Sequence, residues 1–205
     1  MLGKQVHQSI KRRTIIVMSL LLITIVAIVF AVTLKKNDPS SLSYYKESSS
    51  TSYSVNELLS QKTIDWTQID SDKLNFGQTK DIIWLKLDGS FFINGLNVID
   101  IPFRQLDNVE AYTVAKETGE VLDKQISGDR LEYAQKSFGT ERIIFSITKT
   151  TLPIEVLIKS QTTGVNHIPL RIYDFNEFVE SHDFIGLLIA FFIGFSLLAV
   201  IMDLI

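Results

Sequence analysis

The segment from Asp81 to Phe178 alternates apolar and polar residues in short runs, and this alternation constrains the fold more than any other feature. Four runs carry apolar side chains at every second position: Ile83, Leu85 and Leu87; Ile143, Phe145 and Ile147; Ile154, Val156 and Ile158; and Ile168, Leu170 and Ile172. A period of two is that of a strand buried on one face. We therefore predict a series of half-buried β-strands.

Turn-forming dipeptides that end in glycine separate these runs: Asp88-Gly89, Asn94-Gly95, Thr118-Gly119, Ser127-Gly128, Phe138-Gly139 and Thr163-Gly164. Short strands with such turns are typical of an antiparallel sandwich or barrel, and not of βαβ units. The segments Val109–Val114 and Glu120–Leu122 are expected to form a hairpin whose turn uses the positive φ of Gly119. The predicted fold class is therefore mainly β, an antiparallel β-sandwich.

Two apolar runs of membrane length flank this segment. Residues 14–34 carry no charge over 21 positions, enough for a helix to cross the roughly 30 Å hydrocarbon core. The alternative is a cleaved signal peptide. The basic leader, residues 1–13, is expected to stay in the cytoplasm by the positive-inside rule, so the residues after the run are exported. A second run, residues 184–205, is free of charge up to Asp203 and is predicted to be a second transmembrane helix.

Residues 35–54 are rich in serine and poor in large aliphatic side chains, which predicts a linker that does not fold alone. Ser54 and Glu57 have the spacing of a capping box, so Val55–Gln61 is predicted to be a short helix that packs on the sandwich through Leu58 and Leu59. The globular domain is expected over residues 55–180. Its last residues, from position 174, have helical spacing and lead into the second apolar run.

Composition excludes several classes of function. Between residues 35 and 183 there are 16 Lys and Arg against 22 Asp and Glu, so nucleic acid is not an expected partner. The chain has no cysteine, and its three histidines are not spaced as metal ligands, so we expect neither a metal nor a cofactor. No nucleophile elbow, phosphate-binding loop or dinucleotide motif occurs, and we do not expect an enzyme. Only a carboxylate pair for glycoside hydrolysis stays open, because separation in space defines it.

Three stretches together resemble a known family: Leu74–Leu87, Asn108–Phe138 and Leu152–Glu180. The motifs that carry the resemblance are Trp84-Leu85-Lys86-Leu87, the Gly128–Lys136 segment, Lys159-Ser160 and the strand Pro169–Tyr173. In this order they are similar to the type 2 extracellular domain of bacterial seven-transmembrane receptors with diverse intracellular signalling modules. The resemblance covers roughly residues 55–180, and Ile185–Ile205 resembles the first helix of the seven-helix unit.

This resemblance implies a jelly-roll-like sandwich similar to carbohydrate-binding modules, held at the bacterial inner membrane with residues 35–183 facing the periplasm or exterior. Family members carry a cytoplasmic output such as a cyclase, a kinase or a phosphatase. The sequence contains no such module and only the first of the seven helices, so we expect that it is a fragment or a truncated receptor.

Sugar-binding sandwiches offer aromatic faces and a few convergent polar groups. The candidate ligand-binding side chains are Trp84, Arg104, Tyr112, Asp129, Arg130, Tyr133, Gln135, Arg171 and Tyr173. Each has a structural alternative. Trp84 shares a strand face with Ile82 and is a core candidate, and Asp129-Arg130 is also a candidate for a turn-stabilising ion pair. Arg171 and Tyr173 share the outward face of their strand and are equally candidates for ordinary surface.

The sequence thus predicts an extracytoplasmic sensing domain that binds a carbohydrate or another small molecule and passes a conformational shift to its membrane helix. Two alternatives remain open: a module that docks a periplasmic protein, and a non-signalling remnant of a receptor. The lipid bilayer is an expected partner in each case.

Overall fold

The computed structural model describes residues 22, 25, 42–61, 63–70, 73–149, 151–180, 189–194 and 196. The predicted leader, residues 1–13, and nearly all of both predicted membrane spans, 14–34 and 184–205, lie outside this part of the chain. Within the described part, no helix combines the length and the apolarity needed to cross a membrane. All strands belong to one compact unit, Asn37–Phe178.

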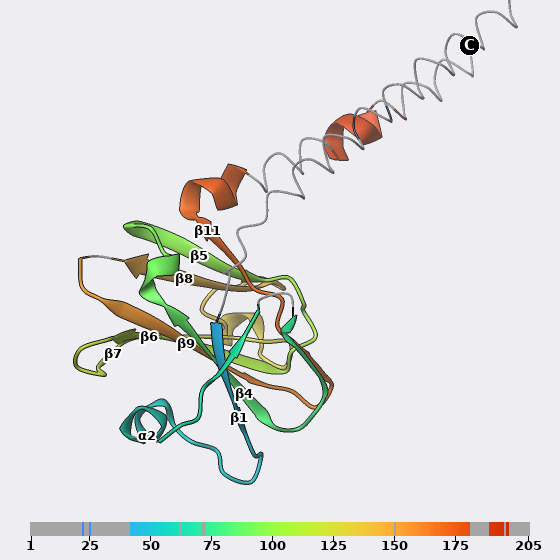
Figure 1. The fold of residues 1–205 in the computed structure, drawn as a ribbon. Coiled ribbons are helices and arrows are strands. Elements are labelled where there is room, and N and C mark those ends of the chain that lie inside the picture. Colours follow the sequence, from blue (N-terminus) through green and yellow to red (C-terminus); the bar gives the residue numbers. More distant parts are fainter. Residues whose placement is uncertain are drawn as a thin grey trace, which may run out of the picture. The chain divides into compact units, whose positions relative to one another are not determined.

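A six-stranded antiparallel sheet forms the larger layer of this unit (Figure 1). Its strand order is β2-β1-β4-β9-β6-β7. In chain order the strands are β1 (Leu42–Glu47), β2 (Thr67–Ile69), β4 (Ile82–Asp88), β6 (Asn108–Ala115), β7 (Val121–Ser127) and β9 (Ile154–Gln161). β4 and β9 lie at its centre, and both faces of each strand are buried.

The remaining described strands form two smaller antiparallel sheets. One has the order β11-β5-β8 and contains β5 (Gly95–Ile101), β8 (Ile143–Lys149) and β11 (Arg171–Asp174). The other pairs β3 (Asn75–Gln78) with β10 (Val165–His167). Short helical elements are α2 (Val55–Ser60) and the 3-10 turns η2 (Gly89–Phe91) and η3 (Tyr133–Gln135).

The main core lies between the large sheet and the three-stranded sheet. Alternate residues of β4, Ile83, Leu85 and Leu87, are fully buried against apolar residues of β5 and β8, such as Ile99 and Phe145. The prediction of a mainly β, antiparallel fold is therefore confirmed, while the jelly-roll connection remains a prediction.

A second apolar cluster covers the opposite, outer face of the large sheet. There the other residues of β4, Ile82 and Trp84, pack with Leu157 and with Leu58 of α2. Figure 1 shows α2 on the outer side of β4 and β9, and the strands β5 and β8 on the other side. The predicted helix and its contact through Leu58 and Leu59 are confirmed. Residues at the start of this helix line the pocket described below.

The prediction of a linker over residues 35–54 is wrong for β1, which pairs with β2 on one side and β4 on the other. The serine content concealed a strand in which Leu42, Ser43 and Glu47 are buried and two tyrosines are partly buried. Tyr44 packs against Phe76 with ring centroids 5.2 Å apart, and Tyr45 lies 6.2 Å from Trp66. Tyrosine favours strands, and pairing on both sides supplies the burial that aliphatic residues would otherwise give.

Other local predictions hold. The β6–β7 hairpin turns at Gly119, whose φ of 70° lies in the left-handed region that favours glycine. Residues 175–180 are helical, and Glu177 N donates to Asp174 Oδ1 over 2.9 Å, which caps the first turn.

Candidate functional site

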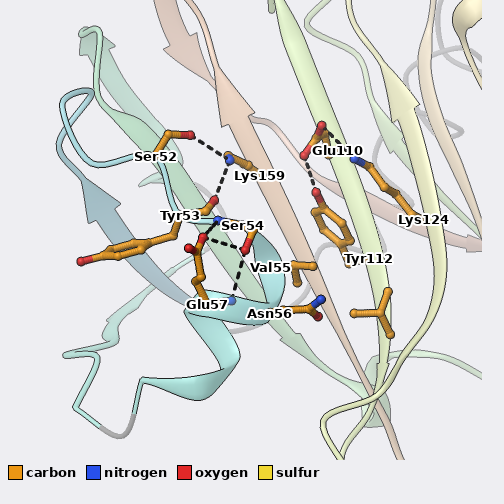
Figure 2. Close-up of a pocket in the computed structure, with 11 residues that line it drawn as sticks. Ser52, Tyr53, Ser54, Val55, Asn56, Glu57, Glu110, Tyr112, Lys124 and Lys159 are labelled. Atoms are coloured by element: carbon orange, nitrogen blue, oxygen red, sulfur yellow. Dashed lines mark hydrogen bonds and ion pairs between the residues drawn. The ribbon is translucent and has the colours of Figure 1, made fainter.

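A pocket of about 480 Å³ opens on the outer face of the large sheet, beside the start of α2 (Figure 2). Residues 52–57 form its wall, and strands β6, β7 and β9 form its floor. Four charged side chains line it, each from a different element: Glu57 of α2, Glu110 of β6, Lys124 of β7 and Lys159 of β9. The pocket is therefore assembled by the fold, and no single segment contains it.

The capping box of α2 fixes the helical part of the wall. Ser54 N donates to Glu57 Oε2 over 2.7 Å, and Glu57 N donates to Ser54 Oγ over 3.3 Å. The Ser54 hydroxyl also donates to Glu57 Oε2. These hydrogen bonds from Ser54 hold the pKa of Glu57 below its ordinary value, because they stabilise the carboxylate. Glu57 is thus an acceptor at the rim.

Tyr53 fastens the wall to the sheet through its backbone. Lys159 Nζ donates to Tyr53 O over 2.9 Å and lies 5.1 Å from the centroid of the Trp84 ring. Tyr53 N donates to Glu47, a fully buried carboxylate that also accepts from Trp84 Nε1 over 2.7 Å. Two charged side chains therefore hold Tyr53 of the wall, Glu47 through its backbone N–H and Lys159 through its backbone carbonyl.

Glu110 organises the floor. Its carboxylate accepts from the Tyr112 hydroxyl and from Lys124 Nζ, the latter over 3.2 Å. Lys124 Nζ also lies 5.3 Å from the centroid of the Tyr112 ring. Burial and the neighbouring Glu110 raise the pKa of Tyr112, so the phenol remains a donor at all physiological pH values. Figure 2 shows Glu110, Tyr112 and Lys124 on the side of the pocket that faces α2.

The lining therefore mixes hydrogen-bond acceptors, at Glu57 and Glu110, with donors at Lys124 and Lys159. Asn56 adds an amide that both donates and accepts. Within the described residues, no three acidic or histidine side chains gather closely enough to hold a metal ion. This arrangement is chemically suited to a ligand that carries several hydroxyl groups, because each hydroxyl both donates and accepts.

Of the nine candidate residues from the sequence, Tyr112 lines this pocket and Trp84 lies directly beneath it. The Trp84 and Tyr112 rings are stacked, with centroids 6.1 Å apart and an interplanar angle of 29°. Trp84 is fully buried, so its ring supports the floor and does not face a ligand.

Five candidates lie on two loops away from the pocket. Arg104 follows β5 and pairs with Glu141 at 3.0 Å, and the Tyr133 hydroxyl donates to the same carboxylate. Arg130 pairs with Asp107 at 3.2 Å instead of with Asp129, its neighbour in the sequence. The Gln135 side chain accepts from Glu132 N, and Asp129 is exposed. Because Arg104, Glu141 and Arg130 are well exposed, such pairs contribute at most about 1 kcal/mol each.

The last two candidates lie on β11, in the smaller sheet. Arg171 and Tyr173 stand opposite Asp100 and Val98 of β5. The Tyr173 ring lies 6.0 Å from that of Phe178 in the helical segment 175–180. Tyr173 therefore connects the sheet to the following helix, and neither residue lines the pocket.

Sequence reasoning missed the residues that complete the pocket: Tyr53, Asn56, Glu110, Lys124 and the pocket role of Lys159. A signal was present for Glu110, because it shares its strand face with Tyr112. Lys124 stands opposite Tyr112 but lies two residues beyond the predicted arm Glu120–Leu122.

Comparison with known proteins identifies one family. The family model described as 7TMR-DISM extracellular 2 matches residues 40–174, from just before β1 to the end of β11. The match begins well before residue 55, in agreement with the place of β1 inside the large sheet. No curated protein matches the chain.

Proposed function

The chain belongs to the 7TMR-DISM extracellular 2 family, and from this premise we propose that its pocket beside α2 binds a carbohydrate or another small molecule rich in hydroxyl groups. Family membership makes this an extracellular receptor domain of the sensing type. We further propose that it is held at the bacterial inner membrane with residues 35–183 outside. In such a receptor, a cytoplasmic output module would receive the signal.

The observation that carries the ligand class is the pairing of Glu110 with Lys124 beside the Tyr112 ring. A sugar hydroxyl can donate to the carboxylate while a neighbouring hydroxyl accepts from the ammonium, and hydrogen bonds to charged groups are stronger than neutral ones. On the facing wall, the Glu57 carboxylate can accept, and the Asn56 amide can donate or accept, hydrogen bonds from hydroxyl groups on the other side of a sugar ring. The pocket volume, about 480 Å³, lies in the range of small-molecule sites.

Binding is a better account of the two carboxylates than hydrolysis. A glycosidase needs one carboxylic acid whose pKa is raised, so that it carries a proton to the leaving group. The pKa of Glu57 moves the other way, because Ser54 stabilises its ionised form. Glu110 is already held by Tyr112 and Lys124. Both groups are arranged as acceptors.

The proposed mechanism of sensing is closure of the wall on the floor. A ligand that bonds to residues 52–57 and to β6 and β7 together favours the arrangement in which the wall is fixed by Tyr53, because only that arrangement offers all the contacts. The shift would then pass to the membrane helix through the helical segment 175–180. Signalling of this kind requires that the ligand bind one of the two arrangements more tightly.

The test is calorimetric titration of the full chain in detergent with a panel of neutral mono- and disaccharides. Lys124→Met and Glu110→Gln are expected to weaken binding of any hit about tenfold or more, since each removes a charged hydrogen-bonding group. Lys80→Met, an exposed lysine outside the pocket, is the control and should change nothing. A folded chain that binds no saccharide, or whose binding ignores both substitutions, would reject the proposal and favour a protein partner.

A further inference from the structure

A second pocket, of about 540 Å³, opens beside η2, next to the start of β1 and the end of β4. It is lined by residues of four strands, of η2 and of the turn after β6, and none of them lines the first pocket: Leu42, Ser43, Gln68, Lys86, Asp88, Ser90, Phe91, Lys116 and Glu155. The two pockets are therefore chemically independent, although both involve the large sheet.

Two of its four charged groups satisfy each other. Asp88 Oδ2 pairs with Lys116 Nζ at 2.5 Å, and Asp88 Oδ1 accepts from Ser90 N over 2.9 Å. These contacts, first of all the one from Lys116, lower the pKa of Asp88 to about 2. The pair is therefore ionised, internally neutral and part of the frame that holds η2 against β4.

The other two charged groups, Lys86 and Glu155, form no direct ion pair and no side-chain hydrogen bond within the described residues. Glu155 does lie near a cation, since Asp88 and, to a smaller extent, Glu155 raise the pKa of Lys116. Both side chains are half-buried. Lys86 Nζ lies 4.3 Å from the centroid of the Trp66 ring, which fixes the direction of the ammonium group. Because neither group is held in a direct ion pair, each can form a charge-assisted hydrogen bond with a ligand.

The strand register separates these two charges. Lys86 stands opposite Leu157, and Glu155 stands opposite Asp88, so Lys86 and Glu155 are diagonal neighbours on one face of the β4–β9 pair. Diagonal neighbours lie roughly 7–8 Å apart along such a ladder. The pocket thus presents one cation and one anion on the same face of the β4–β9 pair.

From this geometry we propose that the second pocket binds a small zwitterion of the α-amino acid class. The ligand carboxylate would meet the Lys86 ammonium and the Ser43 hydroxyl, whose oxygen already accepts from Gln68 Nε2 over 2.7 Å and whose hydrogen is thereby directed elsewhere. The ligand ammonium would meet Glu155. Phe91, which is partly buried, supplies apolar surface for the ligand side chain. A neutral sugar would form a direct ion pair with neither Lys86 nor Glu155.

The test is calorimetric titration of the full chain in detergent with the twenty proteinogenic amino acids. For the best binder, two analogues follow: the amine that lacks the carboxylate and the carboxylic acid that lacks the ammonium. Each analogue is expected to bind at least about tenfold more weakly, because one charged contact is lost. Lys86→Met and Glu155→Gln should cause losses of the same size, with Lys80→Met and Glu120→Gln as exposed controls outside both pockets.

The proposal is overturned if no amino acid binds, or if the analogues bind as well as the zwitterion. The analogue series uses the unaltered chain, so it decides the matter even if a substituted chain fails to fold. Titration with saccharides separates the two pockets. Lys86→Met should leave saccharide binding unchanged and Lys124→Met should leave amino acid binding unchanged, so failure of one proposal is distinguishable from failure of the other.

Discussion

Glu47 is a single residue on which both the wall of the first pocket and the outer cluster depend. It is fully buried, and its two oxygens accept from Trp84 Nε1 and from Tyr53 N. Removing an acceptor there leaves a buried donor without a partner, which costs the desolvation of that donor. The sequence shows only a glutamate in a serine-rich stretch, so the depth of its burial could not be predicted without knowing that β1 lies inside the sheet.

We expect Glu47→Gln to lower the free energy of unfolding by about 1–3 kcal/mol, because an amide NH₂ would replace one of the two acceptors. Urea unfolding followed by tryptophan fluorescence measures it, since Trp84 is the donor concerned. The control is Glu117→Gln in the exposed β6–β7 turn, which should stay within about 0.5 kcal/mol of the unaltered chain. Equal stability of the two variants would show that the carboxylate is not required.

At the scale of elements, α2 illustrates what local sequence rules predict well. The spacing of Ser54 and Glu57 predicts the capping box, and both reciprocal hydrogen bonds are present. The apolar positions Leu58 and Leu59 predict the face that packs on the sheet. Such features depend on residues only three or four positions apart, and this is why they are readable from sequence.

Ser54→Ala should lower the free energy of unfolding by about 1 kcal/mol, the usual cost of losing an N-cap hydroxyl. It should also weaken ligand binding in the first pocket, because Glu57 loses the contacts that fix it at the rim. Urea unfolding and saccharide titration measure the two effects. Ser50→Ala, whose exposed hydroxyl forms a hydrogen bond with the Ser48 hydroxyl, is the matched control. Loss of stability without any change in binding would assign Glu57 a purely structural role.

β1 and the pockets show where sequence reasoning stops. β1 is a strand because β2 and β4 pair with it, and no pattern within Leu42–Glu47 reveals those partners. The first pocket likewise joins Glu57, Glu110 and Lys159, which lie far apart in the sequence and meet only through the order of strands. Alternation predicts which residues share a face of one strand, but the choice of neighbouring strands depends on the whole sheet.

For the molecule as a whole, the carboxylates determine how stability should vary with acidity. Among the residues that the structure describes, four carboxylates have a pKa below the ordinary value: Glu57, Asp81, Asp88 and Asp107. At Asp81 the contacts come from Lys46 and Thr79. At Asp107, burial acts in the opposite direction and is outweighed by hydrogen bonds from Thr163 and by the charge of Arg130. Each carboxylate is thus stabilised by contacts that exist only in the folded chain.

A carboxyl group whose pKa is lowered by folding stabilises the fold fully above its ordinary pKa, and this stability is lost as the pH falls toward the folded pKa. The ordinary value is 3.8 for Asp88, and its value in the fold is about 2. We therefore expect a plateau of the urea midpoint between about pH 5 and pH 7 and a decline between about pH 4 and pH 2. Asp88→Asn should make that decline shallower, whereas Asp129→Asn, at an exposed aspartate that lines neither pocket, should leave its slope unchanged. A decline of equal slope in all three chains would mean that the Asp88–Lys116 pair adds nothing to the folded state.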